Sequence, residues 1–511
     1  MCLAGRVWSQ PKFTSDPFTL GVASGSPTHD SVVLWTRLLP QGFLTPGLGV
    51  EAITVRWEVA RDDKFTALVQ SGQTQALPEL AHSVHAEVSG LASDRWYFYR
   101  FLAGDAVSAV GRTRTFPAPD AQVNKLRLAY ASCQRWEHGY YSAYRHMVEE
   151  NLDAVMFLGD YIYEYPGAGN AVRMPTGGWV VTLDDYRRRY ALHKSDADLQ
   201  AMHAACPWLV TWDDHEVQND YAGLQAGNGG ALDPSAPANF AARRAAAYQA
   251  FYEHMPIRAS VLTQALQGLA TGAEMRIYNH VRYGQLAALY MLDARQYKDP
   301  QACTKDGKLG SSTLNPATCS AWNDPGRSML GATQERWLDG ALSKGSTGWN
   351  VLGQQSVFGP RDFKAGPGET FWNDGWDGYP AARARLSGSL QKNGVANAVL
   401  LGGDVHENWV GHVKADYTQA KSANVGVEFC GTSITSRSGS ASRAKVDEWL
   451  GENPHFVFAD NQRKGYGVVE FTPRQMRTTL RVVDDVTRKD TKIETLASFS
   501  VQADKPVIER S

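Results

Sequence analysis

The chain has 511 residues, of which 43% are hydrophobic and 20% are charged, so it can bury a large core and is not a disordered protein. Its formal net charge of -2 provides no overall field that would attract nucleic acid or an anionic membrane. No apolar run approaches the roughly 18 to 20 residues of a membrane-spanning helix. We therefore expect neither a specific nucleic-acid partner nor a transmembrane segment.

The first part of the chain, residues 12–116, is predicted to form a β-sandwich. Its apolar runs are short, alternate with polar residues or are rich in β-branched and aromatic residues, and are separated by turn residues. This regular spacing is typical of an immunoglobulin-like or fibronectin-like sandwich. The predicted strands are 31–38, 53–62, 83–91 and 95–104. The polar, proline-containing stretch 117–125 is predicted to be a linker.

From residue 126 to residue 511, strand-like and helix-like segments follow one another. This order predicts a second, catalytic domain of the α/β (α+β) class, built in layers. Helices are expected at 141–151, 183–206 and 239–255. Strands are expected at 126–133, 153–160, 208–214, 274–284, 286–294, 348–355, 398–404 and 425–431, with a β-hairpin at 466–483.

Carboxylate, imidazole, thiol and phenol groups follow four of these apolar strands. Ligands of open α/β sheets bind outside the carboxyl ends of the strands. Unpaired carboxylates buried at four adjoining strand ends would be very costly without a counter-charge. We therefore predict a shared metal site. The candidate residues are Cys133, Asp160, Tyr163, Asp213, Asp214, His215, Asn219, Asp404 and His406.

The types of ligand narrow the choice of metal. Asp160 ends a strand and could bridge two cations, as two-metal phosphoesterases require. The thiol of Cys133 and the phenol of Tyr163 suit trivalent iron better than Mg²⁺ or Ca²⁺. His406 lies two residues after Asp404, so both point to one side of an extended chain. Such a site would hydrolyse phosphate esters with a metal-bound hydroxide. A Zn, Mn or Mg site stays an alternative.

Each candidate also has a simpler interpretation. Cys133 could be a small buried hydrophobe, Tyr163 a core aromatic, and His406 a structural histidine. Asp213 and Asp214 could be helix caps. The conjunction of all of them favours the metal site, although the sequence does not decide which of the two adjacent aspartates is the ligand.

The six cysteines include no CxxC pair, which argues against a zinc knuckle or a thioredoxin motif. Cys303 and Cys319 flank a loop rich in Gly, Ser, Thr and Asn. In an oxidising compartment they could form a disulfide. Two unpaired loop thiols are the alternative.

Five motifs of the chain resemble those of PhoD-like alkaline phosphatases, within the calcineurin-like metallophosphatases, and residues 18–27 resemble the small N-terminal β domain of that family. The resemblance implies a four-layer metallophosphatase β-sandwich flanked by helices. The motifs are Ser132-Cys133-Gln134, Gly159-Asp160-Tyr161-Ile162-Tyr163-Glu164, Trp212-Asp213-Asp214-His215-Glu216 with Asn219-Asp220, Leu292-Asp293-Ala294-Arg295-Gln296-Tyr297 and Gly402-Gly403-Asp404-Val405-His406.

The resemblance also implies cofactors and roles. Fe³⁺ would be held by Cys133, Asp160 and Tyr163, and Asp160 would bridge to one or two Ca²⁺ ions. His215 would lie close to the leaving group and protonate it. The remaining candidates would complete the metal shells, namely Asp214 or Asp213, Asn219, Asp404 and His406. Arg135 and Arg295 are candidates for binding phosphate, and an ion pair with Asp293 or another neighbour is an equal alternative for Arg295.

We thus expect an enzyme that hydrolyses phosphate monoesters, phosphodiesters or both, with a small-molecule or lipid substrate. A phospholipase D-type phosphodiesterase is one alternative, and an extracellular binding protein with only structural metals is another. The family resembled is exported, commonly by a twin-arginine leader. Met1 to Gly5 contain no such leader. We expect it to have been removed from a periplasmic or secreted monomer.

Overall fold

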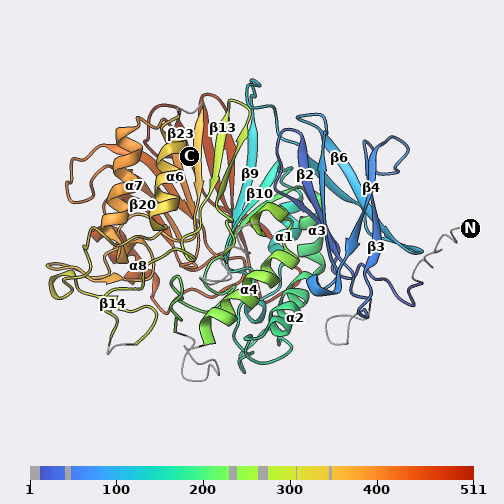
Figure 1. Cartoon of the computed structure of the whole chain (residues 1–511). Coiled ribbons are helices and arrows are strands. Elements are labelled where there is room, and N and C mark those ends of the chain that lie inside the picture. Colours follow the sequence, from blue (N-terminus) through green and yellow to red (C-terminus); the bar gives the residue numbers. More distant parts are fainter. Residues whose placement is uncertain (1–11, 41–47, 229–238, 263–273, 306–307, 345–347) are drawn as a thin grey trace, which may run out of the picture.

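The computed structural model of the chain describes residues 12–40, 48–228, 239–262, 274–305, 308–344 and 348–511. Two large β-sheets lie at its centre, and helices cover their outer faces (Figure 1). The layering is helix, sheet, sheet, helix, so the predicted four-layer α+β architecture is confirmed. Among the described residues, no helix combines the length and apolar character needed to cross a bilayer.

The first large sheet has ten strands and runs from the C-terminal hairpin to the N-terminal part of the chain. Its central strands are parallel to one another, so their carboxyl ends lie at one edge. In spatial order the strands are β24 (Glu509–Arg510), β23 (Ile493–Gln502), β22 (Gln475–Val483), β21 (Lys464–Phe471), β9 (Leu126–Ala131), β10 (Ala154–Leu158), β11 (Trp208–Thr211), β1 (Val22–Gly25), β2 (Ser31–Arg37) and β5 (Ser83–Ser89).

The second large sheet has seven strands and packs against the first through an apolar interior that includes Met156, Leu289 and Val399. Its central strands are buried on both faces, as expected for parallel strands between two layers. In spatial order they are β12 (Asn279–Tyr283), β13 (Ala287–Met291), β15 (Trp349–Gly353), β17 (Ala398–Gly402), β19 (Asn424–Cys430), β18 (Asn408–Lys414) and β20 (Phe456–Asp460). A separate pair is formed by β14 (Thr313–Leu314) and β16 (Phe371–Trp372).

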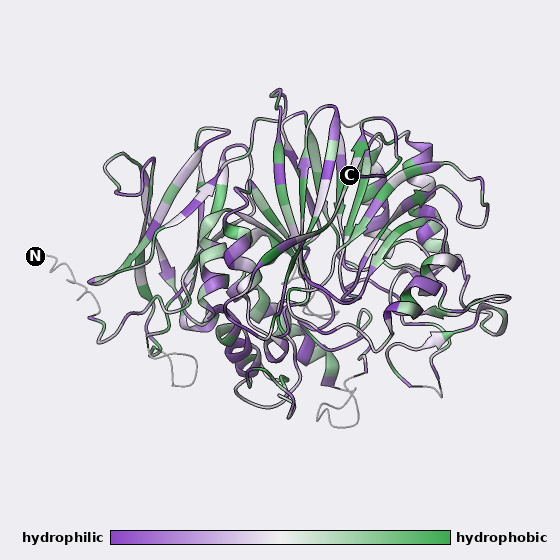
Figure 2. Ribbon diagram, turned by 180° about the vertical axis from the view of Figure 1, so that it is seen from behind, coloured by the Kyte–Doolittle hydropathy of each residue, from purple (hydrophilic) through white to green (hydrophobic). Residues whose placement is uncertain are grey.

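One set of helices covers the ten-stranded sheet, and another covers the seven-stranded sheet. Figure 2 shows hydrophobic segments along the central strands and hydrophilic segments on the helices. The first set is α1 (Ser142–Val148), α2 (Leu183–Lys194), α3 (Ala197–Ala205) and α4 (Phe240–His254). The second is α6 (Gly331–Leu342) and α7 (Pro380–Lys392), with α8 (Arg443–Glu452) next to β20. Short 3-10 turns are η1 (Pro78–Leu80), η2 (Trp136–His138), η4 (Ala259–Leu262), η6 (Pro316–Thr318) and η7 (Trp376–Gly378).

The single helix predicted at 183–206 is wrong, because the chain forms α2 and α3 with a break between them. The cause is Asp196, whose carboxylate accepts hydrogen bonds from the backbone N–H groups of Asp198 and Leu199 at 3.1 and 3.2 Å. A carboxylate in this position caps a new helix N-terminus. The local cap therefore outweighs the continuous helical pattern of the sequence.

The N-terminal part of the chain is the predicted β-sandwich. A smaller sheet packs across an apolar core against β1, β2 and β5. Its strands are β4 (Leu68–Ala76), β3 (Ile53–Ala60), β6 (Trp96–Ala103), β7 (Ala106–Val107) and β8 (Gly111–Arg114). At Gly25, β1 pairs in parallel with Trp208 of β11, which makes the sandwich continuous with the central sheet. The domain limits 12–116, 117–125 and 126–511 stay a prediction.

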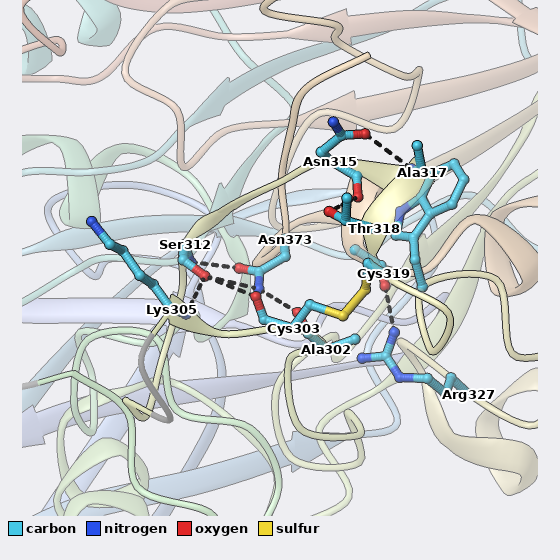
Figure 3. Close-up of a disulfide and its surroundings, with 12 residues drawn as sticks. Ala302, Cys303, Lys305, Ser312, Asn315, Ala317, Thr318, Cys319, Arg327 and Asn373 are labelled. Carbon is cyan, nitrogen blue, oxygen red and sulfur yellow. Dashed lines mark hydrogen bonds between the residues drawn. A yellow bond between two sulfur atoms is a disulfide. The ribbon is translucent and has the colours of Figure 1, made fainter. Parts of the chain in front are cut away.

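Cys303 and Cys319 form a disulfide, which decides the question that the sequence left open. Figure 3 shows Asn373 beside the bridge, where its amide donates to the carbonyl of Ala302 and accepts from the N–H of Ser312, both at 2.7 Å. The disulfide loop is thereby fastened to the segment that carries Asp374.

Candidate metal centre

Three sets of side chains place ligand atoms within 4.8 Å of one another among the described residues. Asp160 belongs to the first two sets and Asp214 to the last two, so the three form one continuous cluster. The sets are Cys133, Asp160 and His406; Asp160, Asp214 and His215; and Asp214, Asp220 and Asp374. Their residues follow β9, β10, β11 and β17, with Asp374 from a loop. The cluster opens into a cleft of about 750 Å³.

The backbone at this cluster is strained. Four of its residues and the neighbouring Asp404 have φ angles of 59° to 66°, a left-handed conformation that costs a non-glycine residue about 1 to 2 kcal/mol. Gly159 before Asp160 has φ 106°, and a Cβ there would lie 2.4 Å from the Cβ of Asp213. Strain of this kind gathers at functional sites. The five residues are Cys133, Asp160, Asp220, Asp404 and His406.

Tyr163 organises the first set. Its hydroxyl donates to Oδ2 of Asp160 at 2.8 Å, accepts from Oγ of Ser436 at 2.7 Å, and lies 3.2 Å from Nε2 of His406. Cys133 is buried beside them, with its Sγ 3.1 Å from Oγ of Ser132. The structure thus brings together the three residues predicted around the iron, with His406 beside them.

Carboxylate oxygens in the cluster lack hydrogen-bond partners. Oδ1 of Asp160, Oδ1 of Asp214 and Oδ2 of Asp213 are buried and unbonded. A buried charge without a partner is costly unless a counter-ion or metal compensates it. The orphaned oxygens therefore fit bound cations, and this fit does not depend on any resemblance.

The protonation of the cluster depends on burial. Burial raises the pKa of Asp160, and Asp214 raises it further. Burial also raises the pKa values of the Cys133 thiol and the Tyr163 phenol, and the carboxylate of Asp160 adds to both shifts. Burial lowers the pKa of His406 to about 3, so its imidazole is neutral, the form that binds metals.

His215 forms an acid–base pair with Glu164. Its Nδ1 lies 2.7 Å from Oε2 of Glu164, and its ring is 4.2 Å from that of Tyr163. Burial alone would lower the pKa of His215, but Glu164, Asp160 and Asp214 together raise it well above its ordinary value. His215 lines the cleft, so a protonated imidazole is available there.

This pair predicts a pH effect. Glu164→Gln removes the closest charge that holds the His215 proton, so the pKa of His215 should fall. The alkaline limb of the kcat profile should then move to lower pH if His215 is the acid. The stability that the pair contributes is present below the unfolded-state pKa and is lost as pH rises through the raised folded-state pKa. Steady-state kinetics across pH test the shift in the kcat profile, and thermal unfolding across pH tests the change in stability. An alkaline limb that does not move would show that His215 is not the general acid.

Arg295 is 1% exposed and surrounded by carboxylates. Its Nε is 2.5 Å from Oδ1 of Asp213, its Nη1 is 2.7 Å from Oδ2 of Asp374, and its Nη2 is 3.5 Å from Oδ2 of Asp214. Burial would lower the pKa of Arg295, but these carboxylates raise it. The geometry favours the ion-pair interpretation over phosphate binding. The partners of the guanidinium are these other neighbours and not Asp293, whose carboxylate accepts hydrogen bonds from the backbone N–H of Arg295 and from Trp212 and Gln296.

The same contacts distinguish the two adjacent aspartates, Asp213 and Asp214, as candidate metal ligands. Asp214 belongs to two of the three sets, whereas Asp213 belongs to none of them and pairs with Arg295. Burial would raise the pKa of Asp214, but Arg295 and His215 lower it below its ordinary value. Asp214 is therefore the better ligand candidate.

The other predicted residues lie around the cluster. Asn219 and Asp404 line the cleft, and burial raises the pKa of Asp404 to about 6. Arg135 lies behind the first set, with its guanidinium carbon 4.9 Å from the ring centre of Tyr165 and its Nε 3.6 Å from Oε2 of Glu137.

Three residues of the site were not among the sequence candidates. Glu164 and Asp220 belong to two of the family-like motifs, so their position after a predicted strand was an available signal. Asp374 lies in a long loop without periodic pattern, and only folding brings it to Asp214.

Two stacked sheets that gather carboxylates, a thiol and imidazoles at their strand ends define a metallophosphoesterase type of site. Comparison with known proteins agrees with this class. Residues 128–480 match the model of the PhoD-like phosphatase family, and residues 4–117 match that of the PhoD-like phosphatase N-terminal domain. The chain belongs to the PhoD-like phosphatase family and is a phosphoric ester hydrolase.

Two relatives show how far the similarity extends. Alkaline phosphatase D of Bacillus subtilis (strain 168) is 45% identical over 509 residues, which cover 98% of this chain and 84% of that protein. The solved structure described as "Structure of PhoD" matches with a TM-score of 0.90 and 44% identity, over 98% of this chain and 93% of that one. The predicted family, fold and enzyme class are thus confirmed.

Proposed function

We propose that this centre hydrolyses both phosphate monoesters and phosphodiesters of small molecules or lipids, using one Fe³⁺ and one or two Ca²⁺ ions. The observation that carries the proposal is the convergence of Cys133, Asp160 and His406 from three distant strand ends to within 4.8 Å. Asp160 continues this set into the carboxylates around Asp214. A site of this kind accommodates more than one cation.

The donor types suggest how the cations are divided. Cys133, Tyr163, Asp160 and His406 would hold iron, which accepts thiolate, phenolate and imidazole ligands. Asp160, Asp214, Asn219 and Asp404 would hold calcium, which prefers oxygen ligands. The oxygen-only set of Asp214, Asp220 and Asp374 would suit a second calcium. Bound cations would neutralise phosphate charge and lower the pKa of water.

The side chains of the protein would then orient the substrate and move protons. His215, kept protonated by Glu164, faces the cleft and would donate its proton to the leaving oxygen. Arg135, near the rings of Tyr163 and Tyr165, would add positive charge behind the phosphate. We assign Arg295 the role of holding Asp213 and Asp214 in place rather than of touching substrate.

Iron bound by a phenolate should colour the protein through charge transfer. Tyr163→Phe is expected to lose the visible absorption band, because the oxygen 2.8 Å from Asp160 is removed. Tyr161→Phe is the matched control, since the Tyr161 hydroxyl lies 2.8 Å from His203 on the other side of the turn. Absorption spectra with elemental analysis test this. A colourless, iron-free and fully active enzyme would instead indicate Zn, Mn or Mg.

The substrate range is tested with an aryl phosphate, an aryl phosphodiester and phosphatidylcholine, each before and after chelation. Chelator-sensitive turnover of both aryl esters supports the proposal. Release of choline alone would indicate the phospholipase D-type alternative. Turnover that resists complete metal removal would contradict a metal-dependent mechanism.

We also propose that the protein is exported to the periplasm or secreted. The Cys303–Cys319 disulfide supports this, because structural disulfides persist in oxidising compartments. The start of the chain, on which the prediction of a removed leader depends, lies outside the described residues. The monomeric state stays a prediction.

A further inference from the structure

The catalytic cleft is larger than its metal cluster requires. Its volume of about 750 Å³ lies within the range of roughly 300 to 1,000 Å³ of pockets that enclose a whole drug-sized ligand. A phosphate group bound at the carboxylates would leave much of this volume free. Besides the carboxylates, the cleft is lined by Arg361 and by four large aromatic side chains, namely Phe363, Trp372, Trp376 and Trp449. This aromatic part of the cleft is available to the organic part of a phosphate ester.

The aromatic wall of the cleft is fixed by hydrogen bonds to helix α8 and to the residue that follows it. Asn453 donates from Nδ2 to the carbonyl of Asp362 at 3.0 Å and accepts at Oδ1 from the N–H of Asp362 at 2.9 Å. Trp449 of α8 donates from Nε1 to the carbonyl of Phe363 at 3.0 Å, and the two rings pack edge to face with their centres 4.7 Å apart. A wall held in this way does not need to be ordered when a ligand binds.

Trp372 differs from the other aromatic residues of the loop 359–380. Among the described residues, no aromatic ring or cation packs on the Trp372 ring, which lines the cleft and is 41% exposed. Its neighbour Asn373 is bound to the disulfide loop (Figure 3), so the backbone that carries the exposed ring is held in place. Each of the other aromatic residues has a partner: Phe363 packs on Trp449, Phe371 on Trp322, Trp376 on Phe358, and Tyr379 lies beneath Arg327. Trp372 thus offers a free stacking surface inside the cleft.

Arg361 has a hydrogen-bond donor to spare beside this wall. Its guanidinium carbon lies 4.8 Å from the ring centre of Phe363 and 5.3 Å from that of Trp409, and its Nη1 binds Oε2 of Glu407 at 3.0 Å. Its Nε is buried and has no acceptor, although the whole residue is only 9% exposed. A buried donor without an acceptor is costly. The unused donor of Arg361 therefore points to an acceptor that a ligand supplies.

We propose that Trp372 and Arg361 form a leaving-group subsite that favours esters of planar aromatic alcohols carrying a hydrogen-bond acceptor. This inference rests on the proposed hydrolysis of phosphate esters at the metal cluster. Trp372 lies two residues before Asp374 of the cluster, so their Cα atoms are at most about 7 Å apart. A substrate bound through its phosphate can therefore reach the indole. A flat aromatic ring stacks on an indole face, whereas a saturated ring of the same size does not.

The test is isothermal titration calorimetry of phosphonates with the intact, metal-loaded enzyme, since phosphonates carry a C–P bond that is not hydrolysed. Benzylphosphonate, cyclohexylmethylphosphonate and methylphosphonate share one anionic group and differ only in the attached carbon group. We expect benzylphosphonate to bind about 3- to 10-fold more tightly than its cyclohexylmethyl analogue, the usual effect of one aromatic pair. Trp372→Leu should abolish this preference, and Trp372→Phe should retain most of it. The matched control is Trp337→Leu, at a partly exposed tryptophan of α6 that does not line the cleft.

The role of Arg361 is tested with 4-acetylbenzylphosphonate, which adds a neutral acceptor to the far edge of the ring. The parent enzyme should bind it about 3- to 10-fold more tightly than benzylphosphonate, the usual effect of one added hydrogen bond. Arg361→Lys keeps a positive charge for Glu407 but removes the Nε donor, so this gain should disappear. An equal gain in Arg361→Lys would overturn the part that we assign to Arg361.

The outcomes separate this inference from the proposed function. Equal binding of benzylphosphonate and its cyclohexylmethyl analogue by the parent enzyme would overturn the aromatic subsite, as would a preference that persists in Trp372→Leu. An equal loss of the preference in Trp337→Leu would also overturn it. In each of these cases methylphosphonate would still bind, so hydrolysis at the metal cluster would stand. A metal-loaded enzyme that binds none of the phosphonates, methylphosphonate included, would contradict the proposed function and the subsite together.

Discussion

Asp160→Asn is expected to lower kcat/KM for an aryl phosphate by at least about 100-fold, since changes even to residues behind metal ligands cost about 10- to 100-fold. Asp160 belongs to two of the three ligand sets, and one of its oxygens is buried without a partner. An amide keeps the size of the side chain but removes its charge and one oxygen ligand. Metal content should fall together with activity.

The control for Asp160→Asn is Asp339→Asn, because the carboxylate of Asp339 lies on α6 and accepts hydrogen bonds from Ser389 of α7 and from Asn393, which follows α7. Steady-state kinetics with elemental analysis of both variants make the comparison. Full activity and full metal content in Asp160→Asn would disprove the central place given to this carboxylate.

Arg295→Met is expected to lower the free energy of unfolding by about 3 to 5 kcal/mol, the usual effect of removing one partner of a buried ion pair. Asp213, Asp214 and Asp374 would lose their shared counter-ion in a fully buried position. Arg295→Lys should recover part of the loss, because it restores the charge but not the planar fork.

Urea unfolding measures this effect, with Arg385→Met as the control. Arg385 pairs with Glu335 at the surface, where an ion pair contributes about 0 to 1 kcal/mol. If Arg295→Met does not accumulate, the lysine variant alone still decides the question. An Arg295→Lys protein as stable as the parent, with unchanged calcium affinity, would contradict the positioning role.

Much of the site could be predicted because it follows from the order of strands. Cys133, Asp160, Asp214 and Asp404 each come after an apolar run, and parallel pairing of β9, β10 and β11 brings three of these strand ends together. Hydrophobic patterning and turn residues are local signals, so the sequence contains them. The same signals predicted the sandwich and most of the central strands.

The rest depends on contacts that have no local signal. Asp213 and Asp214 are adjacent and chemically equal, and only the position of Arg295 separates them. Asp374 reaches the cluster because Lys298 and Gln301 hold its carboxylate, each at a distance between 2.5 and 2.7 Å. The break before α3 likewise depends on one side chain that competes with the helical pattern.

The pairing of β1 with β11 has a mechanical consequence. Strand β11 begins at Trp208 and ends shortly before Asp213. One edge of β11 pairs with β10, and the other edge pairs with β1 of the N-terminal sandwich. Removing the N-terminal sandwich would remove β1 and leave one edge of β11 unpaired, next to the loop that carries Asp213 and Asp214. A protein truncated at residues 117–125 is thus expected to aggregate through the exposed edge of β11. Tags or fusion partners should therefore be attached at the chain ends and not in place of the sandwich.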